Sequence, residues 1–169
     1  SDLVEFHFYD TYANVPEHIL DAAADYGTKM HSLLEAYDNG EINLEHLQLS
    51  QIDPNLKEGV KQYAELKKKY MIYPKSQEVI IDYHERFAGR YDKLDGQNIL
   101  WDVKTTSKKY EDKWACQLGY YYLALGVEKD VGYVIWIPKT QKAKVIMIQP
   151  WDKQKCLEGL ENYEKRFTE

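Results

Sequence analysis

Cysteine and long apolar segments are both scarce in this sequence. The 169 residues include two cysteines, Cys116 and Cys156, whose separation matches no common metal-binding spacing. We therefore expect free thiols and a reducing compartment. The longest apolar run, residues 120–125, is far shorter than the roughly 20 residues that cross a bilayer, and the acidic N-terminus lacks a signal-peptide pattern. These absences predict a cytoplasmic protein with no membrane partner.

A surplus of positive charge is also missing. The formal net charge is −6, which argues against a basic coat that binds nucleic acids in general. Carboxylates gathered around a metal ion would add to the same negative balance, so the charge does not exclude a nucleic-acid partner. Basic residues do cluster at 67–69 and again at Lys104, Lys108, Lys109 and Lys113. For the second cluster, a solvated helix start and a contact with DNA are equally good interpretations.

The sequence has no internal repeat, no low-complexity tract and no phosphate-binding loop of the G-x-x-x-x-G-K-[ST] type. The chain should therefore lack a helicase motor of its own and need no ATP. Its hydrophobic content of 44% and aromatic content of 14% are typical of globular proteins. The length suits one domain, so we expect residues 1–169 to form a single domain.

The periodicity of apolar residues predicts four helices and five strands. The helices are expected at 16–37, 54–70, 113–125 and from the cap Asp152 to about 167, and the strands at 78–85, 87–94, 99–105, 131–137 and 144–148. The order ααβββαββα is typical of an α/β or α+β domain with one mixed central sheet flanked by helices. The helix after the third strand should cross the sheet, which favours a parallel pair between the third and fourth strands.

The stretch from residue 78 to residue 106 places two carboxylates and one ammonium on the same side of a hairpin. Asp92 and Asp102 are ten residues apart, and their midpoint falls among turn-forming residues. With a loop at residues 96–98, the two aspartates lie directly opposite each other, with Cβ atoms roughly 4.5–5.5 Å apart. Lys104 is two residues further along the strand and points to the same face. A small hard cation would fit between the carboxylates.

Two further features strengthen this pattern, which alone also fits a salt-bridged surface hairpin. Asp102 and Lys104 interrupt an otherwise apolar strand, where charges are unfavourable unless they are paired or bound to a metal. Gln117 and Tyr121 are one turn apart in the next predicted helix, so they share a face and point in one direction.

Three further residues are candidate ligands. His31 follows Gly27 by one helical turn, although a lone helical histidine is more often a core or surface residue than a ligand. Gly27 itself predicts either a break in the helix or a close approach of another backbone. Glu78 and Glu85 are candidates for a second metal, but glutamates on strand surfaces are more often solvated, so we leave both out of the predicted site.

Taken together, these residues resemble the PD-(D/E)XK nuclease superfamily, specifically the RecB-type nuclease domain of phage and bacterial exonucleases. The resemblance covers about residues 26–125 and rests on four motifs in order: Gly27-x-x-x-His31, Gly89-x-x-Asp92, Asp102-x-Lys104 and Gln117-x-x-x-Tyr121. The chain departs from the family pattern at Tyr91, which stands where a proline usually precedes the first aspartate. The resemblance implies a restriction-endonuclease-like core.

The resemblance also implies roles for individual residues. It implies that Mg²⁺ or Mn²⁺ is bound by His31, Asp92, Asp102 and the carbonyl of Val103, and that the catalytic residues are Lys104, Asp102 and Asp92. Gln117 and Tyr121 would form the auxiliary substrate-binding motif, in which Gln117 fixes Lys104 or a DNA phosphate. Iron–sulfur relatives carry four cysteines, so the two cysteines here predict no iron–sulfur cluster.

The function that the resemblance implies is a metal-dependent phosphodiester hydrolase, a DNA exonuclease that acts on strand ends and prefers single-stranded DNA. Its expected partners are DNA and a recombination or helicase protein. Structure-specific and restriction-like endonucleases use the same core and form the first alternative. The second alternative is a non-catalytic nucleic-acid-binding subunit with this fold, which the presence of every motif residue disfavours.

Overall fold

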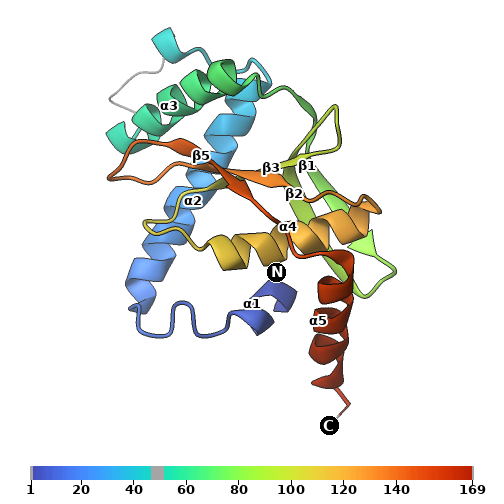
Figure 1. The fold of residues 1–169 in the computed structure, drawn as a ribbon. Coiled ribbons are helices and arrows are strands. Elements are labelled where there is room, and N and C mark those ends of the chain that lie inside the picture. Colours follow the sequence, from blue (N-terminus) through green and yellow to red (C-terminus); the bar gives the residue numbers. More distant parts are fainter. Residues whose placement is uncertain (1, 47–51, 169) are drawn as a thin grey trace.

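A five-stranded sheet forms the centre of the protein, whose computed structural model describes residues 2–46 and 52–168. The strands lie side by side in chain order and are β1 (Pro74–Tyr83), β2 (Phe87–Asp95), β3 (Leu100–Lys104), β4 (Gly132–Trp136) and β5 (Lys144–Ile148). Neighbouring strands are antiparallel except β3 and β4, which are parallel. The prediction of a mixed sheet with a parallel pair after the helical crossover is confirmed (Figure 1).

The described helices are α1 (Asp2–His7), α2 (Glu17–Asp38), α3 (Pro54–Tyr70), α4 (Glu111–Leu125) and α5 (Lys153–Lys165), with a 3₁₀ turn η1 (Leu44–His46). The predicted order lacked α1, because six residues are too short to show a helical period. The short helix is held by tertiary packing instead, since Leu3 and Val4 are buried against α4 and α5. Of the predicted connection at 41–53, residues 47–51 lie outside the described residues. No described helix is long and apolar enough to cross a membrane.

Local signals in the sequence set the ends of several helices. Asp53 precedes α3 and accepts a hydrogen bond from the Asn55 backbone N at 2.8 Å, and Asp152 does the same for the Lys155 backbone N at the start of α5. Such caps stabilise a helix by about 0.5–2 kcal/mol. Gly126 ends α4 with φ +69°, a conformation that glycine adopts without strain. The predicted cap at Asp152 is therefore confirmed.

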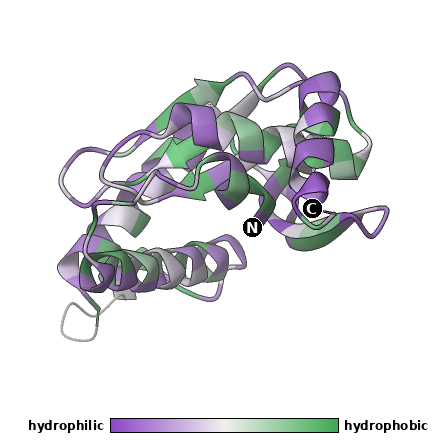
Figure 2. Ribbon diagram, turned by 90° about the horizontal axis from the view of Figure 1, so that it is seen from below, coloured by the Kyte–Doolittle hydropathy of each residue, from purple (hydrophilic) through white to green (hydrophobic). Residues whose placement is uncertain are grey.

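The helices cover the two faces of the sheet with separate apolar cores. One core joins α2 and α3 to alternate residues of β3 and β4, including Met30, Val60, Val103 and Ile135. The other joins α4 to the opposite face and includes Trp114, Leu118, Tyr122, Leu100 and Val134. Figure 2 shows hydrophilic and hydrophobic segments alternating along the helices, as expected when one side packs on a sheet. Because Leu100 faces α4, strand alternation turns Asp102 and Lys104 toward α4 as well.

Candidate active site

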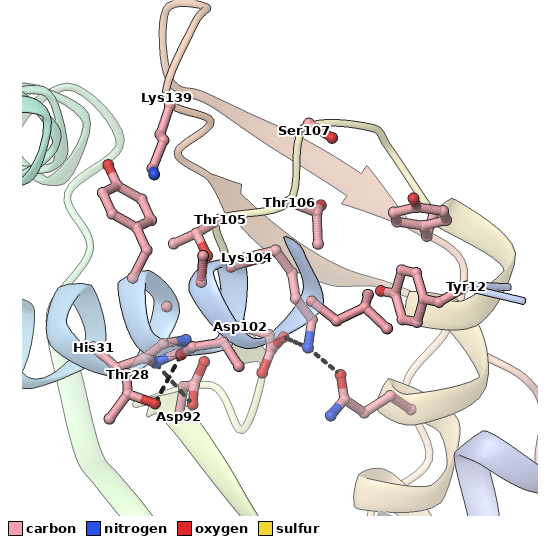
Figure 3. A pocket seen from close by; sticks show the side chains of 18 of the residues that line it. Tyr12, Thr28, His31, Asp92, Asp102, Lys104, Thr105, Thr106, Ser107 and Lys139 are labelled. Atoms are coloured by element: carbon pink, nitrogen blue, oxygen red, sulfur yellow. Dashed lines mark hydrogen bonds and ion pairs between the residues drawn. The ribbon is translucent and has the colours of Figure 1, made fainter. Parts of the chain in front are cut away.

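An open cleft of about 910 Å³ lies where α2 and α4 meet the carboxyl ends of β3 and β4. Its lining contains all six residues whose side chains the sequence analysis selected, namely His31, Asp92, Asp102, Lys104, Gln117 and Tyr121. Figure 3 shows His31 facing Asp92 and Lys104 extending toward Asp102. The fold thus gathers residues from two helices and two strands into one place.

The hairpin between β2 and β3 opens at Asp92. Lys93 pairs with Trp101, which is the predicted register, but the recorded pairing ends there. At the next position the Asp92 carboxylate accepts a hydrogen bond from the Val103 backbone N at 2.7 Å. A side chain therefore takes the place of the next ladder bond between the strands. Asp92 and Asp102 both line the cleft at this split, close enough for their charges to interact, which is the convergence that the hairpin predicts.

The split leaves negative charge with few partners. Asp92 and Asp102 are 9% and 4% exposed. Burial, and then the proximity of Asp102, raises the pKa of Asp92 well above its usual range. Asp102 Oδ2 lies 3.0 Å from Lys104 Nζ as an ion pair, yet it is the one buried side-chain polar atom in the described residues without a hydrogen-bond partner. A hard divalent cation fits such a site, because it favours both ionised carboxylates and occupies an unbonded oxygen.

Lys104 is held in place by α4. Its Nζ donates to Gln117 Oε1 at 2.6 Å, and Gln117 Nε2 in turn donates to the Tyr121 hydroxyl at 3.0 Å. Burial lowers the pKa of Lys104, but Asp102 and Asp92 outweigh burial, so the pKa is raised above its ordinary value. The direction of this pKa shift could not be predicted from the sequence. Lys104 is therefore a charged ammonium whose direction is fixed, and the residue that fixes it is Gln117 on α4.

His31 reaches the site from α2. Its Nδ1 lies 3.7 Å from Asp92 Oδ1, and burial is the main cause that lowers the pKa of His31. A lowered pKa favours the neutral imidazole, the form that ligates metals. One turn earlier, a Cβ built on Gly27 would lie 3.2 Å from Thr105 Oγ1. Gly27 thus marks a close approach of α2 to the segment after β3, whereas the alternative of a helix break is wrong because α2 is continuous.

The glycine that precedes Asp92 in the motif has a steric role. A Cβ built on Gly89 would lie 2.9 Å from Tyr121 Cε1. The Tyr121 ring therefore packs directly over the backbone of β2, which brings α4 down onto the sheet. Gln117 is one turn away on the same helix. This packing therefore also sets how far Gln117 lies from Lys104 on the sheet.

Glu78 lines the same cleft, and the sequence analysis left it out. One donor atom each from Glu78, His31 and Asp92 lie within 4.8 Å of one another. The Glu78 side chain is 12% exposed, and burial raises its pKa although Arg90 acts in the opposite direction. What separates it from Glu85 is its place inside the paired part of β1, whereas Glu85 lies in the β1–β2 turn, and the strand pattern did not reveal this difference. Glu85 is exposed in the β1–β2 turn and does not line the cleft.

The far wall of the cleft follows from the parallel pair. β3 and β4 end side by side, so residues 105–107 and Lys139 both reach the cleft (Figure 3). The lysine cluster predicted from sequence is placed differently: Lys113 is 14% exposed and pairs with Glu5 at 2.8 Å. Of that cluster only Lys104 lines the cleft, and Lys139 supplies the second ammonium. Lys139 was missed because only the β3–β4 pairing brings it near Lys104.

Comparison with known proteins identifies a fold and no family. No family profile matches the chain, and no curated protein matches it in sequence. The crystal structure of a candidate exonuclease from Eubacterium rectale has a TM-score of 0.58 at 18% identity, over 85% of this chain and 65% of that chain. The structure of SSO0001 has a TM-score of 0.43 at 17% identity, over 63% of this chain and 55% of that chain, which is too low to support a conclusion. The protein thus spans less than two thirds of the Eubacterium rectale protein and shares its α/β fold, a mixed five-stranded open sheet with flanking helices.

Proposed function

We propose that this protein is a metal-dependent deoxyribonuclease of the PD-(D/E)XK, RecB type that degrades DNA from strand ends, with a preference for single strands. The observation that carries the proposal is the meeting of Asp92, Asp102 and Lys104 at the split between β2 and β3. Two buried carboxylates beside one fixed ammonium suit the hydrolysis of a phosphodiester, which needs both a cation site and neutralisation of the phosphate. The shared fold with a candidate exonuclease agrees with this function.

The donors present fit Mg²⁺ or Mn²⁺. Asp92, Asp102 and His31 would hold the ion together with the carbonyl of Val103, whose backbone also lies within hydrogen-bonding reach of the histidine ring. Carboxylate and carbonyl oxygens are the ligands these ions prefer. When bound, the ion would supply an activated water and neutralise charge on the phosphate.

The chain itself supplies the second positive charge. The Lys104 ammonium, fixed by Gln117, orients the attacking water or stabilises the charge that develops on the phosphate. A preorganised donor of this kind is worth about 10²–10³ in rate in other enzymes. Tyr121 holds Gln117 by a hydrogen bond and by its packing on β2, so it acts by positioning.

The far wall of the cleft offers a path for the strand. Thr105, Ser107 and Lys139 present hydroxyl and ammonium donors suited to backbone phosphates, whereas the Thr106 hydroxyl donates to the Lys108 carbonyl at 2.6 Å. Tyr12 and Tyr110 also line the cleft, with ring centroids 5.6 Å apart in an edge-to-face arrangement. An aromatic surface of this kind contributes about 1–3 kcal/mol per stacked base. Trp114, in the first turn of α4, is 2% exposed and belongs to the core, so it offers no such surface.

The test is digestion of end-labelled linear and closed circular single-stranded DNA of the same sequence, with Mn²⁺ or with EDTA. We expect the linear strand to disappear, the circle to persist, and EDTA to stop the reaction. Asp102→Asn should be inactive, whereas Lys61→Met, an exposed change on α3, should match the wild type. Equal cutting of both substrates would establish the endonuclease alternative. Binding of DNA without cleavage at any metal concentration would establish the non-catalytic subunit.

A further inference from the structure

We propose that Glu78 is an additional metal ligand of the cleft, acting with His31 and Asp92. This inference rests on the proposed metal dependence and adds a residue that the sequence motifs do not contain. The donor atoms of the three residues lie within 4.8 Å of one another. Two ligands on one Mg²⁺ ion, with bonds of about 2.0–2.1 Å, are at most about 4.0–4.2 Å apart, so the side chains would have to draw in by some tenths of an ångström around the ion. A single divalent cation therefore spans this set of donors without a rearrangement of the backbone.

The backbone of β1 is distorted at this residue. Glu78 has φ +54°, a left-handed conformation that glutamate seldom adopts, between the regular pairs Gln77↔Lys93 and Val79↔Tyr91. The register is the same on both sides, so no residue has been inserted. Left-handed backbone in the middle of a strand persists only where the surroundings impose it, and such residues cluster at functional sites.

The distortion changes which side chains face α4. The Ser76 hydroxyl bonds to the Tyr91 hydroxyl at 2.6 Å, and Tyr91 and Ile81 belong to the same core under α4. Ser76 and Ile81 are an odd number of residues apart, so regular alternation would place them on opposite faces. The alternation therefore shifts by one residue between them, where Glu78 lies, and the Glu78 carboxylate is directed into the cleft instead of following the surface pattern.

The present partner of Glu78 is one that a metal can replace. Arg90 Nε lies 3.0 Å from Glu78 Oε2, with the Arg90 side chain 62% exposed and the Glu78 side chain 12% exposed. The guanidinium is thus free to return to solvent while the carboxylate stays in the cleft. The same cleft holds Asp102 Oδ2, which has an ion pair with Lys104 but no hydrogen-bond partner, in a residue that is 4% exposed, and this independently favours a cation in the cleft.

The experiment is calorimetric titration of the full chain with Mn²⁺, comparing Glu78→Gly with Glu85→Gly. Both glutamates belong to the β1–β2 hairpin and both have positive φ, +54° and +60°. Glycine relieves the strain in each case, so both variants should unfold at the same temperature as the wild type or higher in EDTA. Glu78→Gly should lose about 10–100-fold in Mn²⁺ affinity, and Glu85→Gly should lose none. Wild-type affinity in Glu78→Gly would overturn the inference.

Two further variants separate metal ligation from a structural ion pair. Glu78→Gln keeps the shape of the side chain and should also lose Mn²⁺ affinity, whereas Arg90→Gln removes the competing cation and should raise it. Equal destabilisation by both changes with no effect on Mn²⁺ would show that the pair is only structural. If the wild type binds Mn²⁺ and only Asp102→Asn loses it, the Glu78 inference fails and the proposed function stands. If the wild type does not bind Mn²⁺, both fail.

Discussion

Two buried groups of charges meet at β2, where the adjacent residues Asp92 and Lys93 belong to different groups. The Asp38 cluster consists of Asp38, Tyr63, Lys67 and Lys93, whereas the cleft holds Asp92, Asp102 and Lys104. Asp38, with a side chain 1% exposed, accepts from the Tyr63 hydroxyl at 2.7 Å and pairs with Lys67 and Lys93 at 2.8 and 3.0 Å. One carboxylate there meets two ammonium groups and a hydroxyl.

The cleft reverses this proportion. Asp92 and Asp102 share the single ammonium of Lys104, and one oxygen of Asp102 has no hydrogen bond. Buried charges usually contribute to a fold only when each is paired and hydrogen-bonded. In the Asp38 cluster every charge has a partner within the chain, so a structural role is enough to account for it. The cleft leaves one carboxylate oxygen without a hydrogen bond, and the proposed metal ion would satisfy it.

The largest effect on stability should come from breaking the satisfied cluster. Asp38→Asn leaves two ammonium groups without a carboxylate, and the Lys93 side chain is 3% exposed. We expect a loss of about 3–5 kcal/mol in the free energy of unfolding, measured by urea titration in EDTA. The matched control is Asp25→Asn on the same helix. Its side chain is 65% exposed and pairs with Lys29 in solvent, so its loss should leave the free energy of unfolding close to that of the wild type. Equal losses in the two variants would refute the contrast.

Removing the ammonium of the cleft should affect rate and not metal binding. Lys104→Met deletes the donor fixed by Gln117, so we expect the rate of DNA hydrolysis to fall by about 10²–10³. Mn²⁺ affinity should not fall, because Lys104 repels the ion and ligates nothing. Single-turnover assays and calorimetry measure the two quantities, with Lys61→Met as the control. A parallel loss of Mn²⁺ affinity would make Lys104 part of the metal site's structure.

Much of the fold was readable because the signals are local. Strand alternation and a turn-forming loop gave the β2–β3 register, and apolar periodicity gave α2 through α5. β1 begins at Pro74, earlier than the predicted residue 78, because its polar first half pairs with the buried end of β2. A polar sequence of this kind gives no strand signal of its own. The helix α1 was missed for the same reason, since packing against α4 and α5 defines it.

The part of the site that could be predicted consists of side chains placed by strand alternation or by one helical turn. Asp92, Asp102 and Lys104 meet because of one hairpin, and Gln117 and Tyr121 because of one helical turn. This periodicity gave no reason to place the candidate Glu78 in the site, and it did not point to Lys139 at all. The position of Glu78 depends on a left-handed residue inside a strand, and that of Lys139 on the parallel pairing of β3 with β4. Both are long-range properties of the sheet, which a single sequence does not encode in any short pattern.

A smaller effect should distinguish the cleft by its pH dependence. The pKa of Asp92 is raised in the folded chain by burial and by Asp102, so folding without metal binds a proton that the unfolded chain releases near its ordinary pKa of about 3.8. This stability is present below that pH and is lost as pH rises toward the raised pKa. Asp102→Asn removes the repulsion. In EDTA we therefore expect Asp102→Asn to be more stable than the wild type, by a margin that grows with pH.

The order should invert when Mn²⁺ is added. The ion stabilises the wild type by binding only the folded state, and Asp102→Asn loses a ligand and with it most of this gain. Thermal unfolding at several pH values, each with EDTA and with Mn²⁺, measures both comparisons. A variant less stable than the wild type in EDTA at neutral pH would mean that the carboxylates do not repel each other.

The smallest effect concerns a buried pair that carries no charge. His7 Nε2 and the Tyr120 hydroxyl lie 2.9 Å apart in the seam between α1 and α4, and burial lowers the pKa of His7 from 6.5. The unfolded chain then binds a proton that the folded chain resists, so stability is present above pH 6.5 and is lost as pH falls toward the lowered pKa. His7→Gln cannot titrate, and its Tm should change less than that of the wild type between pH 7 and pH 5. His18→Gln, at the exposed start of α2, is the control and should follow the wild-type curve. Equal slopes in all three proteins would show that the His7 pair is indifferent to protonation, unlike the charged groups on β2.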